Sequence, residues 1–302
     1  MPDLAASVTV DSRFISAADG LSLHVRCYEP AAASTYMPVL CLPGLTRNEA
    51  DFTPLATYLA TDRTFPRRVF ALDSRGRGRS AYDPDWRNYN PAVELADVLA
   101  VIAAFGLHRA AFVGTSRGGI LTMLLAAVRP ELIAGAVLND IGPVIEPAGL
   151  ERIKRYAGKI PQPRDFAEGA SLLRDLFGAQ FPRLDQAAWL AWAHRSWRQD
   201  KGELIGRYDQ ALANTLDGVT PDQPMPDLWA QFDALPPVPL MVVRGGLSDI
   251  LSAGTVEAMQ ARRPDIEVLE VPDQGHAPLL AEPEIMSRIS TFLARCDKPA
   301  LR

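Results

Sequence analysis

The run Gly114-Thr115-Ser116-Arg117-Gly118-Gly119 is the part of the chain whose residue types and spacing best suit chemistry. A serine hydroxyl is a poor nucleophile at neutral pH, so it needs a base and a third group that holds the base in one tautomer. An apolar run, Ala111 to Val113, precedes the serine and a helical run, Ile120 to Val128, follows it. The glycines let the two backbones approach closely. We therefore predict that Ser116 is a nucleophile exposed at a sharp strand-to-helix turn.

Four histidines are candidates for the base. His24 lies in a predicted N-terminal hairpin, His108 comes just before a strand and so at the opposite edge of the sheet, and His194 lies in a helical region where packing or surface exposure is expected. His276 follows the last predicted strand. Because open α/β sheets bind ligands at the carboxyl ends of their strands, we expect His276 to be the base.

Aspartates that follow predicted strands are the candidates for the acid. Asp249 lies beyond the strand at 239–243 and 27 residues before the histidine. Asp140 and Asp73 follow the strands at 134–138 and 68–72 and are geometrically possible substitutes. We expect Asp249 to be the acid, keep Asp140 as the alternative and interpret Asp73 as structural.

The elements that must position these residues alternate along the chain. Continuous apolar runs, typical of strands buried on both faces of a parallel sheet, occupy 39–42, 68–72, 110–113, 134–138, 239–243 and 266–271. Amphipathic helical patterns lie at 91–105, 119–128, 253–262 and 283–295, and a hairpin is predicted for 13–17 and 21–28. The pattern predicts an α/β fold with a mostly parallel central sheet flanked by helices.

The alternation stops between Val144 and Pro236. This stretch has no strand pattern, several short helical patterns broken by prolines, and four of the five tryptophans: Trp189, Trp192, Trp197 and Trp229. Because strand patterns resume at Pro239, we predict one core domain (1–143 and 237–302) with a helical subdomain (144–236) inserted into it. The tryptophans are interpreted as the small core of this subdomain, and the alternative is that some of them line a cavity.

Composition excludes several function classes. The 31 Lys and Arg residues against 36 Asp and Glu residues give a formal charge of −5, which disfavours binding to nucleic acid. The three cysteines (Cys27, Cys41 and Cys296) are too few for a disulfide framework or a Cys-rich zinc site. No segment approaches about 18 uninterrupted apolar residues, and no signal-peptide pattern is visible. We expect a cytoplasmic monomer or homodimer that has no metal, organic cofactor, nucleic acid or membrane as partner.

With these motifs, the chain resembles the α/β-hydrolase-fold serine hydrolases over nearly its whole length, from the hairpin to the final helix. The order Ser116, Asp249, His276 is similar to the family's nucleophile–acid–base order. A helical cap inserted after the sixth strand is common in the family, so the resemblance implies that residues 144–236 cover the active site. The loop at 73–80 is also similar to one common in the family, and we predict that it is a structural turn.

The resemblance further implies an oxyanion hole formed by the backbone N–H groups of Leu45 and Arg117. Pro43 stands where the family often has histidine, while Gly44 and the N–H group after it are retained. For the Arg117 side chain, we expect a structural pair with a carboxylate such as Asp140, and contact with substrate is the alternative.

The resemblance implies an enzyme that hydrolyses small to medium, largely apolar esters or lactones through a covalent acyl-enzyme, without a cofactor. Ser116 at the turn argues against dehalogenase and epoxide hydrolase chemistry, which uses a carboxylate nucleophile in this family. One alternative is carbon–carbon bond hydrolysis of meta-cleavage-type diketones, although relatives with that activity often carry tryptophan where this chain has Ala277. The other is a non-catalytic receptor that binds a small molecule under the cap.

Overall fold

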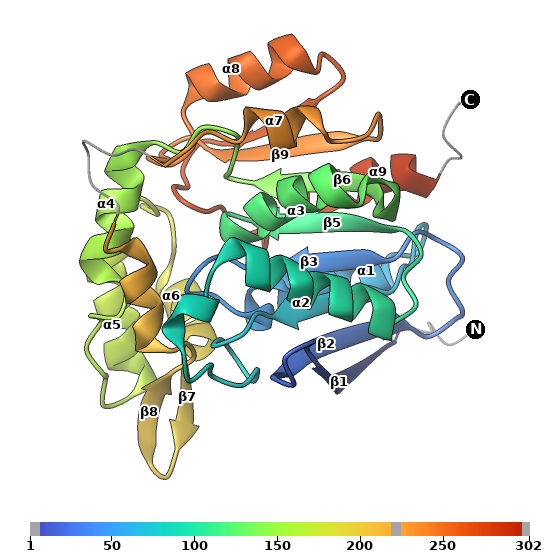
Figure 1. Ribbon diagram of the computed structural model, residues 1–302. Coiled ribbons are helices and arrows are strands. Elements are labelled where there is room, and N and C mark those ends of the chain that lie inside the picture. The colour runs from blue at the N-terminus through green and yellow to red at the C-terminus, as the bar shows by residue number, and fades with distance from the viewer. Residues whose placement is uncertain (1–6, 219–224, 298–302) are drawn as a thin grey trace.

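The central sheet brings the predicted strands side by side (Figure 1). The computed structural model describes residues 7–218 and 225–297. Eight strands in these residues form one sheet in the order β1-β2-β4-β3-β5-β6-β9-β10. The strands are β1 (Val8–Ser16), β2 (Ser22–Pro30), β3 (Val39–Leu42), β4 (Val69–Asp73), β5 (Ala110–Thr115), β6 (Ile133–Asn139), β9 (Leu240–Gly245) and β10 (Glu267–Val271). β2 pairs antiparallel with β1 and with β4, and the remaining pairs are parallel. The predicted α/β class with a mostly parallel sheet is confirmed.

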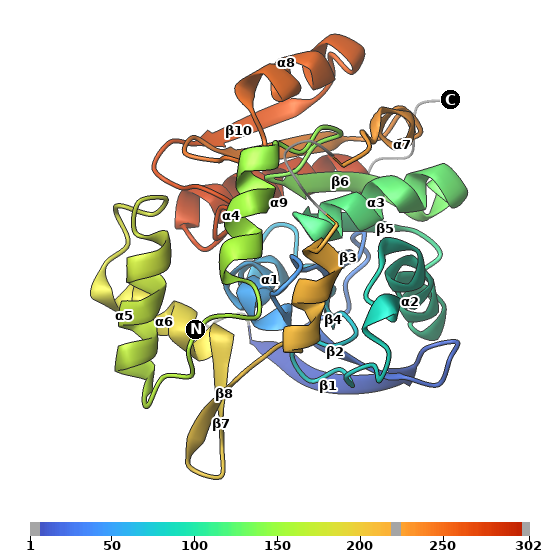
Figure 2. The ribbon, with the colours of Figure 1, turned by 60° about the vertical axis from the view of Figure 1, so that its left-hand side comes forward.

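Helices cover both faces of the sheet, which is why β3, β4 and β6 are buried throughout. α1 (Thr53–Thr61) and α9 (Pro283–Leu293) pack on one face, and α2 (Pro91–Ala104), α3 (Arg117–Val128) and α8 (Ala253–Arg262) pack on the other (Figure 2). The predicted helix at 253–262 is α8 itself, and α3 begins two residues earlier than expected, at Arg117. Short 3₁₀ turns complete the core: η1 (Glu49–Phe52), η2 (Trp86–Asn88), η3 (Pro130–Leu132) and η5 (Ala294–Asp297).

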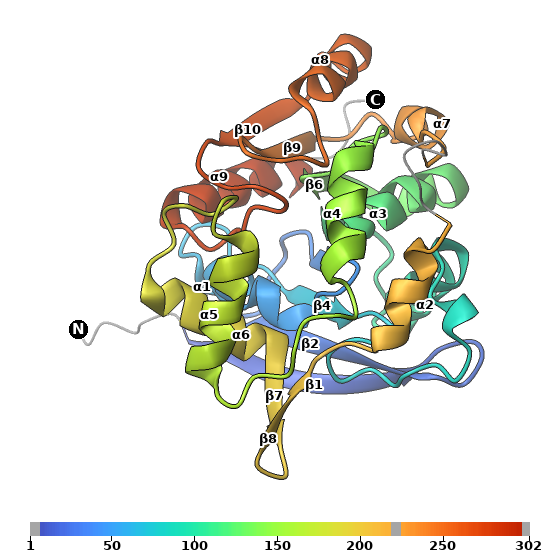
Figure 3. The same cartoon turned by 90° about the vertical axis from the view of Figure 1, so that its left-hand side faces the viewer.

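From α4 to η4, the chain between β6 and β9 lies at the end of the sheet where the parallel strands finish (Figure 3). It contains α4 (Pro147–Tyr156), α5 (Phe166–Phe177), α6 (Gln186–Ser196), β7 (Trp197–Asp200), β8 (Glu203–Gly206), η4 (Gln210–Leu216) and α7 (Trp229–Asp233). β7 and β8 pair antiparallel with each other. This hairpin corrects the expectation that the stretch holds no strand.

The residues 144–236, called the inserted segment below, have a small hydrophobic core of their own. Trp189 and Trp192 stack in parallel on α6, and Phe177 of α5 stacks on Trp192. Trp197 joins the same cluster. α7 differs, because its Phe232 belongs to the main core and α7 packs against α3. The part of the inserted segment that stands apart from the sheet therefore ends before α7.

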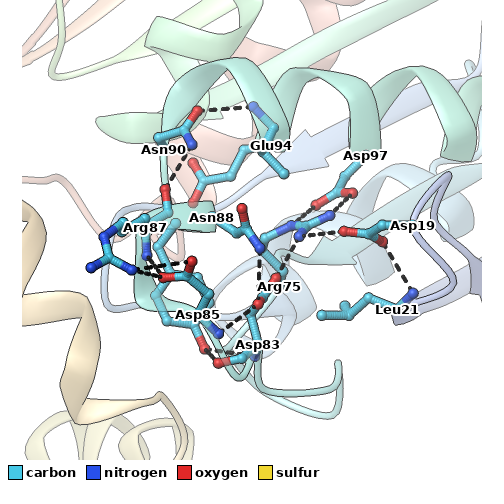
Figure 4. Close-up of polar contacts among 12 residues, drawn as sticks. Asp19, Leu21, Arg75, Asp83, Asp85, Arg87, Asn88, Asn90, Glu94 and Asp97 are labelled. Carbon is cyan, nitrogen blue, oxygen red and sulfur yellow. Dashed lines mark hydrogen bonds and ion pairs between the residues drawn. The ribbon is translucent and has the colours of Figure 1, made fainter.

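A buried arginine fixes the loop that follows β4 (Figure 4). Arg75 is 1% exposed. Its Nε and Nη2 donate to the Asp97 carboxylate at 2.7 and 2.6 Å, and its Nη1 donates to Asp83 at 2.7 Å and to Asp19 at 2.9 Å. Buried charges need such partners, and these join the loop to α2 and to the β1–β2 turn. The contacts support the interpretation of residues 73–80 as a structural turn.

Two further observations concern membrane-spanning helices and the cysteine thiols. None of the helices in the described ranges is both long and apolar enough to cross a lipid bilayer. Cys27, Cys41 and Cys296 are buried and free.

Candidate active site

Ser116 lies in a strained turn between β5 and α3. Its φ is +50°, a backbone conformation that residues other than glycine rarely adopt. A Cβ on Gly118 would lie 2.0 Å from the carbonyl oxygen of Leu42, and one on Gly114 would lie 2.5 Å from the Gly118 carbonyl. Only glycine fits these two positions, so the sequence pattern reflects close contact between the strand, the helix and neighbouring β3.

His276, on the loop after β10, contacts the serine. Its Nε2 lies 2.9 Å from Ser116 Oγ, and its Nδ1 lies 2.8 Å from Asp140 Oδ2. An ionised carboxylate can only accept a hydrogen bond, so the Nδ1 proton points to Asp140 and Nε2 is left to accept from the serine hydroxyl. The sequence prediction of Ser116 and His276 as partners agrees with this geometry.

The structure corrects the expected acid. Asp140 is fully buried, and its carboxylate also accepts the Gly245 N–H at Oδ1 (2.8 Å) and the Ser248 hydroxyl at Oδ2. Its φ of +53° turns the side chain from the end of β6 across the end of β9 toward the histidine. The backbone N–H of Asp140 donates to Val243 O at 2.7 Å, which holds this turn in place.

Asp249 instead faces the inserted segment. Its carboxylate forms a bidentate salt bridge with Arg152 of α4, in which Nε donates to Oδ2 at 2.6 Å and Nη2 donates to Oδ1 at 2.9 Å. Burial opposes ionisation of Asp249, but the Arg152 guanidinium holds the pKa of this carboxyl below its ordinary value. A Cβ on Gly149 would lie 2.4 Å from the Asp249 carbonyl oxygen, so α4 rests directly on the loop. Asp249 thus fastens the inserted segment to the core.

The other sequence candidates lie outside this site. His24 and Asp73 are both fully buried and their Nδ1 and Oδ2 are 2.7 Å apart. Together with Glu49 they are the described residues with metal-ligand spacing, all ligand atoms lying within 4.8 Å of one another. The Asp73 oxygens already accept the N–H groups of Glu49 and Arg79, so contacts within the fold account for the cluster. His194 stacks on Phe166 with ring centroids 3.8 Å apart.

The two predicted oxyanion donors, the N–H groups of Arg117 and Leu45, come from different segments of the chain. Arg117 is the first residue of α3, where backbone N–H groups have no partner within the helix. Leu45 lies on the loop after β3 and lines the same cavity as Ser116. Throughout 7–218 and 225–297, no carbonyl oxygen accepts the N–H group of either residue. Both N–H groups are therefore free to bind a ligand.

A buried ionic network, which sequence reasoning missed, joins these two residues. Arg117 Nε lies 2.8 Å from Glu94 Oε2, and Glu94 Oε1 accepts from Arg77 Nη1 at 2.6 Å. Arg77 Nε then donates to the carbonyl oxygen of Leu45 at 2.7 Å. Burial opposes ionisation of Glu94, yet the two guanidinium groups keep its pKa below the ordinary value. The network couples the loop that carries Leu45 to the helix that begins at Arg117.

This arrangement also settles the partner of the Arg117 side chain. The expected pairing with a carboxylate is correct, but the carboxylate belongs to Glu94 and not to Asp140. Arg117 Nη2 donates in addition to the Tyr89 carbonyl at 3.1 Å. The side chain therefore points into the core beside α2.

A cavity of about 500 Å³ opens over Ser116 and His276. The inserted segment contributes apolar and aromatic side chains to its wall: Ile153, Tyr156, Ile160, Leu173, Phe177, Trp192, Trp197, Ile205 and Tyr208. The core contributes Pro43, Leu45, Phe52, Tyr82, Ala277, Pro278, Leu279 and Leu280. Two tryptophans that pack in the inserted segment's core, Trp192 and Trp197, thus also line the cavity. The cavity's charged lining residues are Arg47, Asp51, Arg195, Arg198 and Asp209, together with the imidazole of His276.

Most of the chain matches one family of known proteins. The model of the Alpha/beta hydrolase family matches residues 39–289, from the start of β3 to near the end of α9. The chain belongs to the alpha/beta hydrolase family. The resemblance to this family, stated from the sequence motifs, is confirmed.

Similar alpha/beta hydrolases are known over most of the chain. A 3-hydroxybutyrate-oligomer hydrolase of Cupriavidus necator is 32% identical over 278 residues, which cover 89% of this chain and 93% of the relative. A 2-(acetamidomethylene)succinate hydrolase of Mesorhizobium japonicum is 27% identical and is covered to 87%. The crystal structure of an alpha/beta hydrolase from Novosphingobium aromaticivorans is 42% identical, covers 96% of this chain and 99% of its own, and superposes with a TM-score of 0.88. The comparisons support hydrolase activity.

Proposed function

We propose that this alpha/beta hydrolase cleaves carboxylic esters, including lactones, through an acyl-enzyme formed on Ser116. The observation that most directly supports the proposal is the continuous relay Ser116–His276–Asp140, with contacts of 2.9 and 2.8 Å, at the base of a cavity of about 500 Å³. Nucleophile, base and orienting acid are all within hydrogen-bonding distance.

In the proposed mechanism, His276 Nε2 takes the proton of Ser116 as Oγ attacks the ester carbonyl. The tetrahedral oxyanion is stabilised by the N–H groups of Leu45 and Arg117, each of which contributes roughly 3–4 kcal/mol in comparable sites. The imidazolium then protonates the departing alcohol. In the second half, Nε2 takes a proton from water as the water oxygen attacks the acyl carbon. The imidazolium then returns this proton to Ser116 Oγ as the bond between Oγ and the acyl carbon breaks, which releases the acid and restores the enzyme.

Asp140 has an orienting role in this mechanism. Its carboxylate fixes the Nδ1–H tautomer and stabilises the imidazolium that forms twice in each cycle. Because Gly245 and Ser248 donate to the same carboxylate, the acid is itself held in place. The mechanism needs neither a metal nor an organic cofactor.

We propose further that the inserted segment acts as the cap that shapes the substrate pocket. Its apolar side chains over Ser116 suit the aliphatic parts of a small to medium substrate. The relative from Cupriavidus necator is named as a hydrolase of 3-hydroxybutyrate oligomers, which fits an ester substrate of this size.

Two experiments test the ester hydrolase assignment. Labelling of Ser116 by a fluorophosphonate, together with a burst of 4-nitrophenol from a 4-nitrophenyl ester, is the expected result, and both are lost in Ser116→Ala. Inertness toward both reagents, with tight binding of a small ligand, favours a receptor. Faster turnover of a vinylogous 1,5-diketone than of any ester favours carbon–carbon bond hydrolysis.

A further inference from the structure

Two arginines and one aspartate form a charged cluster in the wall of the catalytic cavity. Arg47 donates Nε and Nη2 to the two oxygens of Asp51, both at 2.6 Å, and Nη1 to Ser196 Oγ at 2.8 Å. Arg195 reaches the same carboxylate through Nε alone, at 3.2 Å. We call Arg47 and Arg195 the arginine pair. One carboxylate therefore serves two guanidinium groups.

The charge of the arginine pair is only half balanced within the described part of the chain. No residue there accepts a hydrogen bond from Arg195 Nη1 or Nη2. Burial and the nearby Arg47 lower the pKa of Arg195, as expected for a cation that is short of an anion. The Arg195 side chain is 17% exposed and lines the cavity, so its two free Nη groups are open to an anion that takes the place of water as acceptor.

The remaining charged residues of the cavity wall do not supply that anion. Asp209 accepts from the Tyr89 hydroxyl at 2.6 Å and caps the Ala211 N–H. Arg198 is half-exposed and pairs with Asp200 at 3.7 Å. The arginine pair, with Asp51 as its one anionic partner in the described residues, therefore gives this part of the cavity wall a net positive charge.

The Arg47 side chain begins close to the nucleophile, and Arg195 lines the same cavity. A Cβ built on Gly44 would lie 3.6 Å from Arg47 Cγ and 3.7 Å from Ser116 Cβ, so these two side chains flank the same glycine. The Arg47 guanidinium lies 5.6 Å from the ring centre of Trp192, which belongs to the apolar wall. Because Ser116, Arg47 and Arg195 line one cavity, a substrate whose reacting carbonyl is at Ser116 can place a second group against the arginine pair.

We propose that the arginine pair binds a free carboxylate of the substrate, so that the enzyme prefers esters that carry a second, ionised carboxyl group. The planar guanidinium matches the planar carboxylate, and charge-assisted hydrogen bonds from Arg195 Nη1 and Nη2 supply the recognition. The proposal rests on the proposed ester hydrolysis and adds the class of substrate: short acidic esters rather than neutral ones.

A purely structural role for Arg195 has a different consequence. Its backbone carbonyl already accepts Asn48 Nδ2 at 2.8 Å, and this bond attaches the end of α6 to the core without the side chain. Replacement of the side chain therefore leaves one attachment intact, and the folded variant can be assayed. If the Arg195 side chain only held the inserted segment in place, its replacement would lower the turnover of all substrates alike. Loss of a carboxylate site would instead change the preference between substrates with and without a free carboxylate.

The test compares matched esters. The 4-nitrophenyl half-esters of glutarate and adipate are assayed against their methyl esters, which differ only in the free carboxylate. We expect the wild-type kcat/KM to be about 10- to 100-fold higher for the half-esters, the range of a charge-assisted hydrogen bond. Arg195→Met lowers this ratio by about 10-fold or more, Arg195→Lys retains part of it, and Arg164→Met, on an exposed cap arginine outside the cavity, leaves it unchanged.

A second readout needs no turnover. Binding of glutarate to the Ser116→Ala protein, measured by calorimetry, is expected to weaken by about 10-fold or more when Arg195→Met is added. An unchanged ratio in Arg195→Met, or a wild-type enzyme that prefers the methyl esters, overturns the carboxylate site and leaves the ester hydrolase assignment intact. Failure of that assignment itself is distinct: neither ester is cleaved and Ser116 is not labelled.

Discussion

Asp140 and His276 lie on loops that follow β6 and β10, yet Asp140 Oδ2 and His276 Nδ1 are 2.8 Å apart across the end of β9. Asp140→Asn keeps the shape of the side chain but replaces the carboxylate, which accepts the Nδ1 proton of His276, by an amide. The amide permits the wrong histidine tautomer. We expect kcat for a 4-nitrophenyl ester to fall by roughly 10⁴-fold, measured in steady state with the folded state checked by circular dichroism.

Asp249→Asn is the matched control, because it removes the same charge from a nearby loop. Asp249 pairs with Arg152 and not with His276, so kcat should stay close to the wild-type value. A large loss in Asp249→Asn with near-normal rates in Asp140→Asn contradicts the relay described above.

Glu94→Gln should destabilise the protein strongly. Glu94 and Arg77 are both almost fully buried, and the substitution leaves Arg77 and Arg117 without their shared carboxylate. Loss of one partner of a buried ionic network costs about 3–5 kcal/mol of the free energy of unfolding. Urea denaturation measures this quantity. Glu131→Gln, which removes an exposed pair with Arg129, should leave the urea midpoint unchanged, and equal shifts in the two variants argue against the network.

Gly118→Ala should abolish the serine turn. The added Cβ would lie 2.0 Å from the Leu42 carbonyl oxygen, and the contacted atom is backbone that cannot rotate away. We expect loss of fluorophosphonate labelling and a lower melting temperature. Gly254→Ala on α8 meets nothing within 4 Å and should stabilise the protein by about 0.5–1 kcal/mol, as expected in a helix. A normally labelled Gly118→Ala enzyme would show that the turn tolerates a side chain.

Stability should depend on pH through Glu49. Burial and the charge of Asp73 raise the pKa of Glu49 from 4.5 to about 7, so the folded state holds this proton more tightly than the unfolded state. The stabilisation is complete below pH 4.5 and is lost as the pH rises through 7. Glu49→Gln removes the ionisation, so the variant should gain up to about 3 kcal/mol relative to wild type between pH 5 and pH 8.

Urea denaturation at the two pH values tests this prediction. Glu284→Gln, at an exposed position of α9, serves as the control and should follow the wild-type curve. Parallel pH curves for wild type and Glu49→Gln would mean that Glu49 ionises normally in the folded protein.

The strands and the serine turn could be predicted because their signals are local. An apolar run bounded by turn residues defines each buried strand, and the glycines around Ser116 follow from backbone contacts within a few ångströms. His276 was predicted from the edge of the sheet at which it lies, and the loop after β10 brings it to Ser116 past the ends of β9 and β6. Each of these inferences needed only one segment and the rule that parallel strands end at the same edge.

The choice between Asp140 and Asp249 could not be made locally. Both follow strands that end at the same edge, and the difference arises from the positive φ of Asp140 and from Arg152, which the inserted segment brings to Asp249. Neither is visible as a sequence pattern. Glu94 was missed because an acidic residue in the first turn of a helix is ordinary, and only the fold shows that two arginines meet it.

The β7–β8 hairpin did have a local signal. Lys201 and Gly202, both with positive φ, form a two-residue turn, and Lys-Gly lies between two runs that pair residue by residue from Trp197 to Gly206. The strands themselves are polar on the exposed side, so no apolar run marks them. β7 and β8 are therefore recognised by their hydrogen-bonded pairing with each other and not by a run of buried apolar residues.

Because Asp140 directly follows β6, the proposed catalytic residues are separable in the chain from the segment that we propose selects the substrate. Ser116, Asp140 and His276 all lie outside residues 144–236, and the loop after β9 contributes Asp249 to attachment. A graft of the corresponding segment from another member of the family could therefore change substrate preference without rebuilding the relay. Such a chimera would need a partner for Asp249, an acceptor for Asn48 Nδ2 and replacements for the other contacts with the core, among them Ser196 with Arg47 and Asp209 with Tyr89.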